Sequence, residues 1–203
     1  MADSKLSALA ALTAANVDPT SDLLYIDDVS VTTSKSITVA ALSQAMIVLG
    51  TEQASTSGTS IDFTGIPSGT KRIVINFSGV STSGTSKVIV QLGDAGGPET
   101  TGYLGGITQS AGSAVSNFTF SDGFMTDGVV SASNVAHGSI ILNLERASTF
   151  MWTAHIAMAP SNAAGSSFGA GSKATSAELT QVRITTQNGS DTFDAGVINI
   201  SYT

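Results

Sequence analysis

Six segments of the chain alternate apolar and polar residues with a period of two. The clearest is residues 72–80, RIVINFSGV, in which Ile73, Ile75 and Phe77 share one face. This alternation places side chains on opposite faces of a β-strand and does not fit the 3.6-residue period of a helix. The other five segments are residues 87–93, 139–145, 150–159, 181–186 and 196–202. The second half of the chain is therefore predicted to be built from strands.

Three shorter apolar runs, at residues 61–63, 103–107 and 117–120, bring the expected strands to nine. Gly, Ser, Asn and Asp separate the runs, and no helical period lies between them. Strands at this spacing predict a mainly β fold, an antiparallel β-sandwich or jelly roll. Residues 121–137 and 160–177 are rich in Gly, Ala and Ser, so we expect them to be long loops that lie along a neighbouring subunit.

The composition limits the partners of this fold. Charged residues make up only 11% of the 203 residues, against about a quarter in a typical protein. Eight Lys and Arg with a net charge of −7 and no basic cluster argue against nucleic acid as a partner. No apolar run approaches a membrane span, and the absence of cysteine excludes disulfides and thiolate metal sites.

The expected strands also carry apolar residues on their second face, which a monomer would expose to water. These residues are Val74, Ile89, Ile141 and Met151. Together with the low charge, they predict that the protein associates with copies of itself.

The first fifty residues follow a different pattern. Leu23–Ile26 is predicted to be a short strand, residues 29–31 a second extended piece, and Thr38 the N-cap of a helix over residues 39–47. So few apolar residues do not support an independent fold, which implies that this segment docks on a partner. We expect a small α+β anchoring segment at residues 1–50, a polar linker at 51–60 and the sandwich at 61–203. The residues expected to make the attachment are Leu23, Leu24, Ile26, Val39, Leu42 and Met46.

The sequence GDAGGP at residues 93–98 differs by one letter from the GDSGGP that surrounds the nucleophilic serine of chymotrypsin-like proteases. Ala95 stands where the serine would be, and both histidines, His137 and His155, follow it, whereas those proteases place the histidine first. Gly, Asp and Pro are the residues that turns require. GDAGGP is therefore interpreted as a turn directly after a strand.

We expect no enzyme activity, no metal and no cofactor, because no catalytic constellation is recognisable. Asp122 and Asp127, in SDGFMTDG, could offer calcium two carboxylates, but they lack the EF-hand spacing and are typical of turns. A glycan hydrolase would need a pair of carboxylates across a cleft, which the sequence does not place. Phe124 and Phe168 are candidate contacts for a glycan, since exposed rings stack on apolar sugar faces.

Residues 4–42, SKLSALAALTAANVDPTSDLLYIDDVSVTTSKSITVAAL, resemble the N-terminal segment of bacteriophage virion fibre and surface proteins. The following stretch, IDFTGIPSGTKRIVINFSGVSTSGTSKVIVQLGDAGGPETTGY, is similar to a β module of phage heads and tails. Long fibres of this kind carry repeats or coiled-coil shafts, and this chain has neither. The resemblance therefore indicates a small knob on a particle.

The resemblance implies a homotrimer that decorates or cements the capsid, with residues 1–50 bound to the major capsid protein or to other virion proteins. A short tail fibre or receptor-binding knob that contacts host surface glycan is the alternative. The expected location is the virion, assembled in the host cytoplasm.

Overall fold

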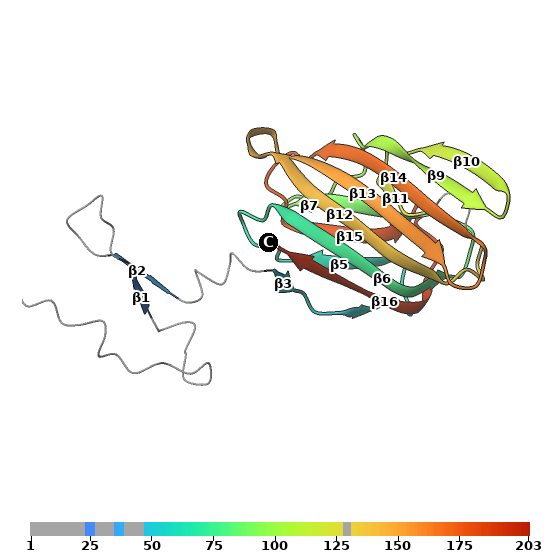
Figure 1. The fold of residues 1–203 in the computed structure, drawn as a ribbon, viewed down its shortest axis with the longest axis horizontal. Coiled ribbons are helices and arrows are strands. Elements are labelled where there is room, and N and C mark those ends of the chain that lie inside the picture. The colour runs from blue at the N-terminus through green and yellow to red at the C-terminus, as the bar shows by residue number, and fades with distance from the viewer. Residues whose placement is uncertain (1–22, 27–34, 39–46, 128–130) are drawn as a thin grey trace, which may run out of the picture. The chain divides into compact units, whose positions relative to one another are not determined.

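The structure is a computed structural model that describes residues 23–26, 35–38, 47–127 and 131–203 (Figure 1). The chain divides into two units, Met1–Ile47 and Val48–Thr203. Each unit is described by itself.

Two strands form the described part of the first unit. β1 (Leu23–Ile26) pairs with β2 (Lys35–Thr38) in antiparallel register, with Leu23 opposite Thr38 and Ile26 opposite Lys35. The strand predicted at residues 23–26 is confirmed. Thr38, the predicted N-cap, is the last residue of β2. The extended piece expected at 29–31 and residues 39–46 of the expected helix lie outside the described residues.

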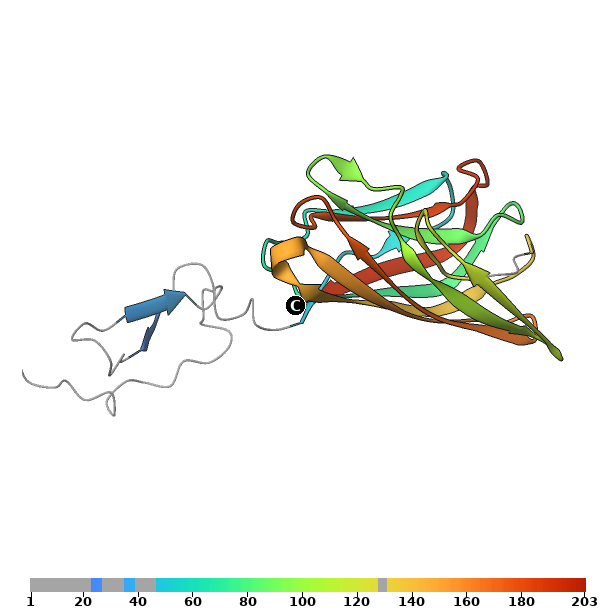
Figure 2. The same ribbon diagram turned by 90° about the horizontal axis from the view of Figure 1, so that it is seen from above.

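The second unit contains two antiparallel sheets, and it confirms the expected β-sandwich. In the large sheet the strand order is β10-β9-β14-β13-β12-β6-β16-β3, and β4 also pairs with β16. In the small sheet the order is β11-β7-β15-β5, and β8 pairs with β7. Figure 1 labels most of these strands, and Figure 2 shows the sheets as two layers. A single turn of 3₁₀ helix, η3 (Ala147–Thr149), joins β12 to β13.

Each of the nine runs predicted from the sequence coincides with a strand, although Lys87, Tyr103, Phe120 and Phe150 lie just outside the strand ends. The strands of the large sheet are β3 (Val48–Leu49), β4 (Gln53–Ala54), β6 (Arg72–Thr82), β9 (Leu104–Ala111), β10 (Ala114–Thr119), β12 (Ala136–Arg146), β13 (Met151–Pro160), β14 (Gly165–Ala174) and β16 (Phe193–Tyr202). Those of the small sheet are β5 (Ser60–Thr64), β7 (Val88–Asp94), β8 (Gly97–Pro98), β11 (Phe124–Met125) and β15 (Gln181–Thr186).

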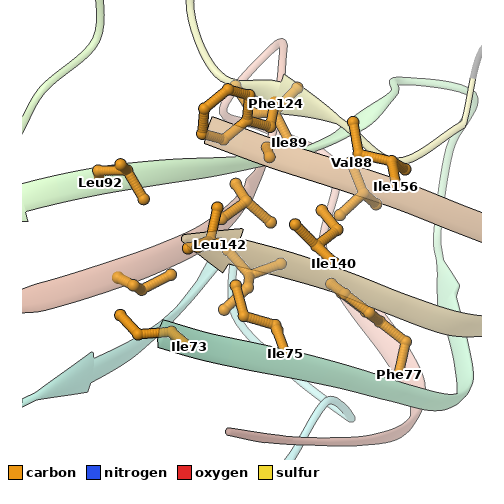
Figure 3. Close-up of a cluster of buried hydrophobic side chains, with 14 of the residues drawn as sticks. Ile73, Ile75, Phe77, Val88, Ile89, Leu92, Phe124, Ile140, Leu142 and Ile156 are labelled. Atoms are coloured by element: carbon orange, nitrogen blue, oxygen red, sulfur yellow. The ribbon is translucent and has the colours of Figure 1, made fainter. Parts of the chain in front are cut away.

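The core lies between the sheets and consists of the apolar faces that the alternation predicted. Ile73 and Ile75 of β6 and Ile140 and Leu142 of β12 are fully buried, as Figure 3 shows. Burial of each such side chain contributes about 1.5–3 kcal/mol to the free energy of folding. Strand β7 is buried on both faces.

One residue expected on an outer face is therefore placed differently. Ile89 is buried, because the backbone at Gly123 lies against its side chain: a Cβ atom on Gly123 would lie 3.0 Å from Ile89. Val74, Ile141 and Met151 lie on the outer face of the large sheet and are half-buried.

The prediction that residues 160–177 form a loop is wrong, because β14 occupies the middle of this segment. β14 pairs with β13 on one side and with β9 on the other, so it is an internal strand of the large sheet. Its inward positions include glycines. The ring of Phe120 fills the space at Gly171, and Ile107 fills that at Gly169. A Cβ atom on Gly171 would lie 2.8 Å from the Phe120 ring and 2.6 Å from the carbonyl oxygen of Leu104. Glycine in a strand often marks such a close approach.

The prediction that residues 51–60 form a linker is also wrong in part. β4 pairs with β16, and Ser55 is fully buried. The Ser55 amide donates to Gly196 O at 2.9 Å, and its hydroxyl donates to Ala195 O at 2.8 Å. The loop expected at residues 121–137 likewise contains β11 and the first residues of β12.

Replacing Gly171 with valine should destabilise the sandwich, because the new side chain would overlap the Phe120 ring. We expect Gly171→Val to lower the free energy of unfolding by about 1–3 kcal/mol, the usual range for overpacking. Chemical denaturation measures it. Ala170→Val is the matched control, since Ala170 is the exposed neighbour on the same strand. Equal losses in both variants would contradict the assigned packing.

Candidate interaction surface

The GDAGGP sequence forms a tight turn between β7 and β8, as predicted. Gly93 pairs with Pro98 and Asp94 with Gly97, so Ala95 and Gly96 lie at the tip. The Asp94 carboxylate accepts a hydrogen bond from the Gly96 amide at 2.7 Å, as in an Asx-turn. Ala95 is exposed.

A polar cluster behind this turn holds it against β14. Lys173 is only 7% exposed, and its ammonium forms an ion pair with the carboxylate of Glu99. The Ser176 amide also donates to Glu99, at 2.6 Å, and the Ser176 hydroxyl donates to Asp94. The buried Tyr103 hydroxyl accepts from the Leu92 amide at 2.7 Å and donates to Glu99 O at 2.9 Å. The cluster therefore joins the turn, β7 and the end of β14.

The charges of the cluster are fixed by these contacts. Burial alone would raise the pKa of Glu99, but the hydrogen bonds from Lys173 and Ser176 outweigh it and leave that pKa below its usual value of 4.5. The hydrogen bond from the Ser176 hydroxyl is the main cause that lowers the pKa of Asp94. Burial raises the pKa of Tyr103, which keeps its phenol protonated and able to donate. Sequence reasoning missed this cluster.

The other candidate polar residues are separately engaged. Asp122 accepts from the Gln187 amide group at 3.0 Å, and Asp127 accepts from the Ser167 hydroxyl at 2.9 Å. The Nδ1 atom of His137 accepts from the Gly79 amide at 3.3 Å. Within the described ranges, no three His, Cys, Asp or Glu side chains gather closely enough to hold a metal ion. No helix in that part of the chain is long and apolar enough to cross a membrane.

The two aromatic residues proposed to contact glycan lie in different environments. Phe124 was predicted wrongly, because its ring is fully buried and packs edge-on against Tyr103 and Phe120. The ring of Phe168 is 61% exposed on the outer face of β14. Its cross-strand neighbours are Thr108 and Ala157. Of the two, only Phe168 offers a ring to a partner.

Of the six residues predicted to attach the protein to a particle, Leu23, Leu24 and Ile26 lie together in β1. The other three, Val39, Leu42 and Met46, lie outside the described residues.

Phe168 belongs to a surface that we call the outer face: the outward-pointing residues of six adjacent strands in the large sheet. Its charged residues are Arg72 of β6, opposite Asn143, and Arg146 of β12, opposite Met151, which lie at one end of the face. The uncharged residues of the outer face include Val115 and Asn117 of β10, Leu104, Gly106 and Thr108 of β9, Phe168, Ala170 and Ser172 of β14, Met151, Thr153, His155 and Ala157 of β13, Ser139, Ile141 and Asn143 of β12, and Val74 and Asn76 of β6.

Three large apolar residues of the outer face are strongly exposed. They are Leu104 at 70%, Val115 at 66% and Phe168 at 61%, and they come from three strands that are neighbours in the sheet. A polar pair lies between them, since the Thr108 hydroxyl donates to the Asn117 side-chain oxygen at 2.8 Å. An uncharged surface with exposed apolar residues is typical of a protein-binding or ligand-binding face.

Two hollows lie away from the outer face. One, of about 330 Å³, is bordered by β5, β16 and residues 49–53, and Asp62 at its wall forms an ion pair with Arg183 at 2.7 Å. The other, of about 140 Å³, lies beside η3 and is lined by Leu144, Phe150 and Trp152. The Nε1 atom of Trp152 is buried and has no hydrogen-bond partner among the described residues.

Comparisons of the chain with protein-family models, with curated proteins and with solved structures gave no match.

The Glu99 carboxylate should make the stability of the sandwich depend on pH. Because the folded pKa of Glu99 is lowered, its contribution is present above the usual value near 4.5 and is lost as the pH falls through the folded pKa. We expect Glu99→Gln to be less stable at pH 7, by about 2 kcal/mol, the usual size for a hydrogen bond to a charged group. Its stability should also fall less than that of the wild type between pH 5 and pH 3. Urea unfolding across this range measures both effects.

Glu145→Gln is the matched control, because Glu145 is exposed and pairs only with its exposed neighbour Arg146, at 3.2 Å. This variant should keep the pH dependence of the wild type. The same slope in Glu99→Gln as in the wild type would exclude the assigned role of Glu99.

Proposed function

We propose that the protein is a non-enzymatic structural component of a bacteriophage particle, a homotrimer that decorates or cements the capsid. Residues 1–50 bind the major capsid protein or other virion proteins, and the sandwich faces outward. The division of the chain at Ile47 into a separate N-terminal unit and a β-sandwich carries this proposal. This division matches the attachment segment and the compact knob that the resemblance to phage surface proteins implies.

The chemistry of the first unit supports an anchoring role. β1 contributes Leu23, Leu24 and Ile26 within a short two-stranded hairpin, and an isolated hairpin of this size is at best marginally stable in water. Docking on another protein would add stabilising contacts to a hairpin of this size. A segment that is ordered by its partner is suited to attachment.

The chemistry of the sandwich supports a role in an assembly. The chain carries few charges, and the outward positions of β10, β9 and β14 carry none. Such a surface is suited to many copies packed side by side.

Particle attachment should fail when a charge enters the apolar stripe that Val39, Leu42 and Met46 form on the helix predicted from the sequence. We expect full-length Leu42→Asp to lose at least about tenfold in affinity for particles depleted of the protein, because burying an unpaired carboxylate is unfavourable. Co-sedimentation with the depleted particles measures binding. Ser43→Asp adds the same charge one residue away, off the predicted stripe, and should bind nearly as the wild type does.

An antibody against the sandwich, viewed on intact particles by electron microscopy, locates the protein. Many copies over the capsid would support decoration, whereas labelling only at the tail tip would favour the alternative knob. No labelling of any particle, together with unchanged binding of Leu42→Asp, would contradict both.

The second candidate function is a receptor-binding knob that contacts host surface glycan, and the exposed ring of Phe168 favours it. An aromatic ring beside hydroxyl and amide groups, here Thr108 and Asn117, can stack on a sugar and hydrogen-bond to it.

If this second function is correct, Phe168 contacts glycan and not another copy of the chain, so Phe168→Ala should lower binding to host cells by about tenfold or more without changing the oligomeric state. Flow cytometry with labelled protein measures binding. Phe118→Ala, which removes a half-buried ring from the neighbouring strand β10, is the control and should bind as the wild type does. Saturable binding that Phe168→Ala leaves unchanged would exclude Phe168 as the contact.

A further inference from the structure

We propose that a second copy of this chain docks on the hairpin of β9 and β10 and on the adjacent outer face of β14. We call this surface the docking face. The inference rests on the proposed homotrimer and specifies which part of the sandwich forms the contact between copies.

The docking face contains the three most exposed large apolar side chains of residues 50–127 and 131–203, the part of the described sandwich that follows β3. Leu104, Val115 and Phe168 point to the same side of β9, β10 and β14, as their register shows: Ser110 is opposite both Val115 and Ser166, and Thr108 is opposite Phe168. Each is more than 60% exposed. Covering the three side chains would remove their apolar surface from water.

The backbone of β10 gives a second, independent reason. β10 is the edge strand of the described large sheet, and five of its six residues are exposed. Edge strands are usually protected by charged side chains, by proline or by a covering element. Residues 114–119, AVSNFT, contain neither a charge nor a proline. An edge of this kind is protected when another chain covers it.

The charge distribution allows a copy of the same chain to be the partner. The protein carries a net charge of −7, so two copies repel each other wherever carboxylates face carboxylates. The docking face lacks carboxylates, whereas Glu52, Glu145 and Asp194 are exposed elsewhere on the described chain. In a homotrimer each copy can turn this face toward the other two without burying a charge, and the core of an interface is typically poor in charges.

The size of the outer face is sufficient for a stable contact. Six strands spaced about 4.8 Å apart, each with about eight residues rising about 3.3 Å, cover roughly 750 Å². A partner in a stable interface buries about 800 Å². The three strands of the docking face cover roughly 380 Å², about half of this area, so the contact extends over the neighbouring strands β13 and β12.

The experiment compares the oligomeric state of three full-length proteins by light scattering coupled to size exclusion. The wild type should have three times the 20.4-kDa mass of one chain. Val115→Glu should shift the equilibrium toward the monomer, with association weakened at least about a hundredfold, because it would bury a carboxylate at the contact. Ala95→Glu adds the same charge at the exposed β7–β8 turn and should remain trimeric.

Thermal unfolding of each variant at low concentration shows that the sandwich is folded, which is expected because Val115 and Ala95 are both exposed. A monomeric wild type, or equal association in Val115→Glu and Ala95→Glu, would overturn the inference. Dissociation of both variants would overturn it too, since the effect would then be one of charge alone.

The outcomes separate this inference from the proposed function. A trimer that depends on Val115 but is never found on particles would uphold the docking face and reject the virion role. A particle-bound protein whose association is insensitive to Val115→Glu would do the reverse.

Discussion

The contact between the ring of Phe120 and Gly171 of β14 is the constraint on which the large sheet depends. Gly171 offers no side chain, so the ring lies directly against the strand and closes the core at that point. β14 can then pair with both β13 and β9, which brings the β9–β10 hairpin into the sheet. The same strand carries Phe168 outward and Lys173 inward. Three features of the molecule thus follow from one aromatic–glycine contact.

The period-two alternation was enough to predict the sandwich, because strands with one buried face must alternate. β14 was not predicted, because its inward residues are three glycines, Ser167 and Lys173 and so show no apolar alternation. The apolar side chain that packs against Gly171 is Phe120, which belongs to another segment. For β7 the alternation predicted one exposed face, with Ile89 on it. The strand is buried on both faces, so Ile89 is buried as well.

The polar features depend on contacts between residues distant in the chain, which periodicity does not reveal. Glu99 and Lys173 are 74 residues apart, and no motif connects them. Phe124 stands among turn residues in SDGFMTDG and was expected to be exposed, yet the turn folds back on β7 and buries it. Phe168, within a Gly- and Ser-rich stretch, was expected to be exposed and is. The GDAGGP turn was predicted because Asp, Gly and Pro act locally.

The buried Lys173 has a further consequence for how β14 finds its place. A glycine-rich strand is weakly specified in register, and a shift by one residue would turn every side chain to the other face. Such a slip would carry Lys173 away from Glu99 and drive Phe168 inward against Phe120. Ser167, bonded to Asp127 at 2.9 Å, opposes the same slip near the other end of the strand. The contacts of Lys173 with Glu99 and of Ser167 with Asp127 therefore favour one register for β14, whose glycines alone would allow several.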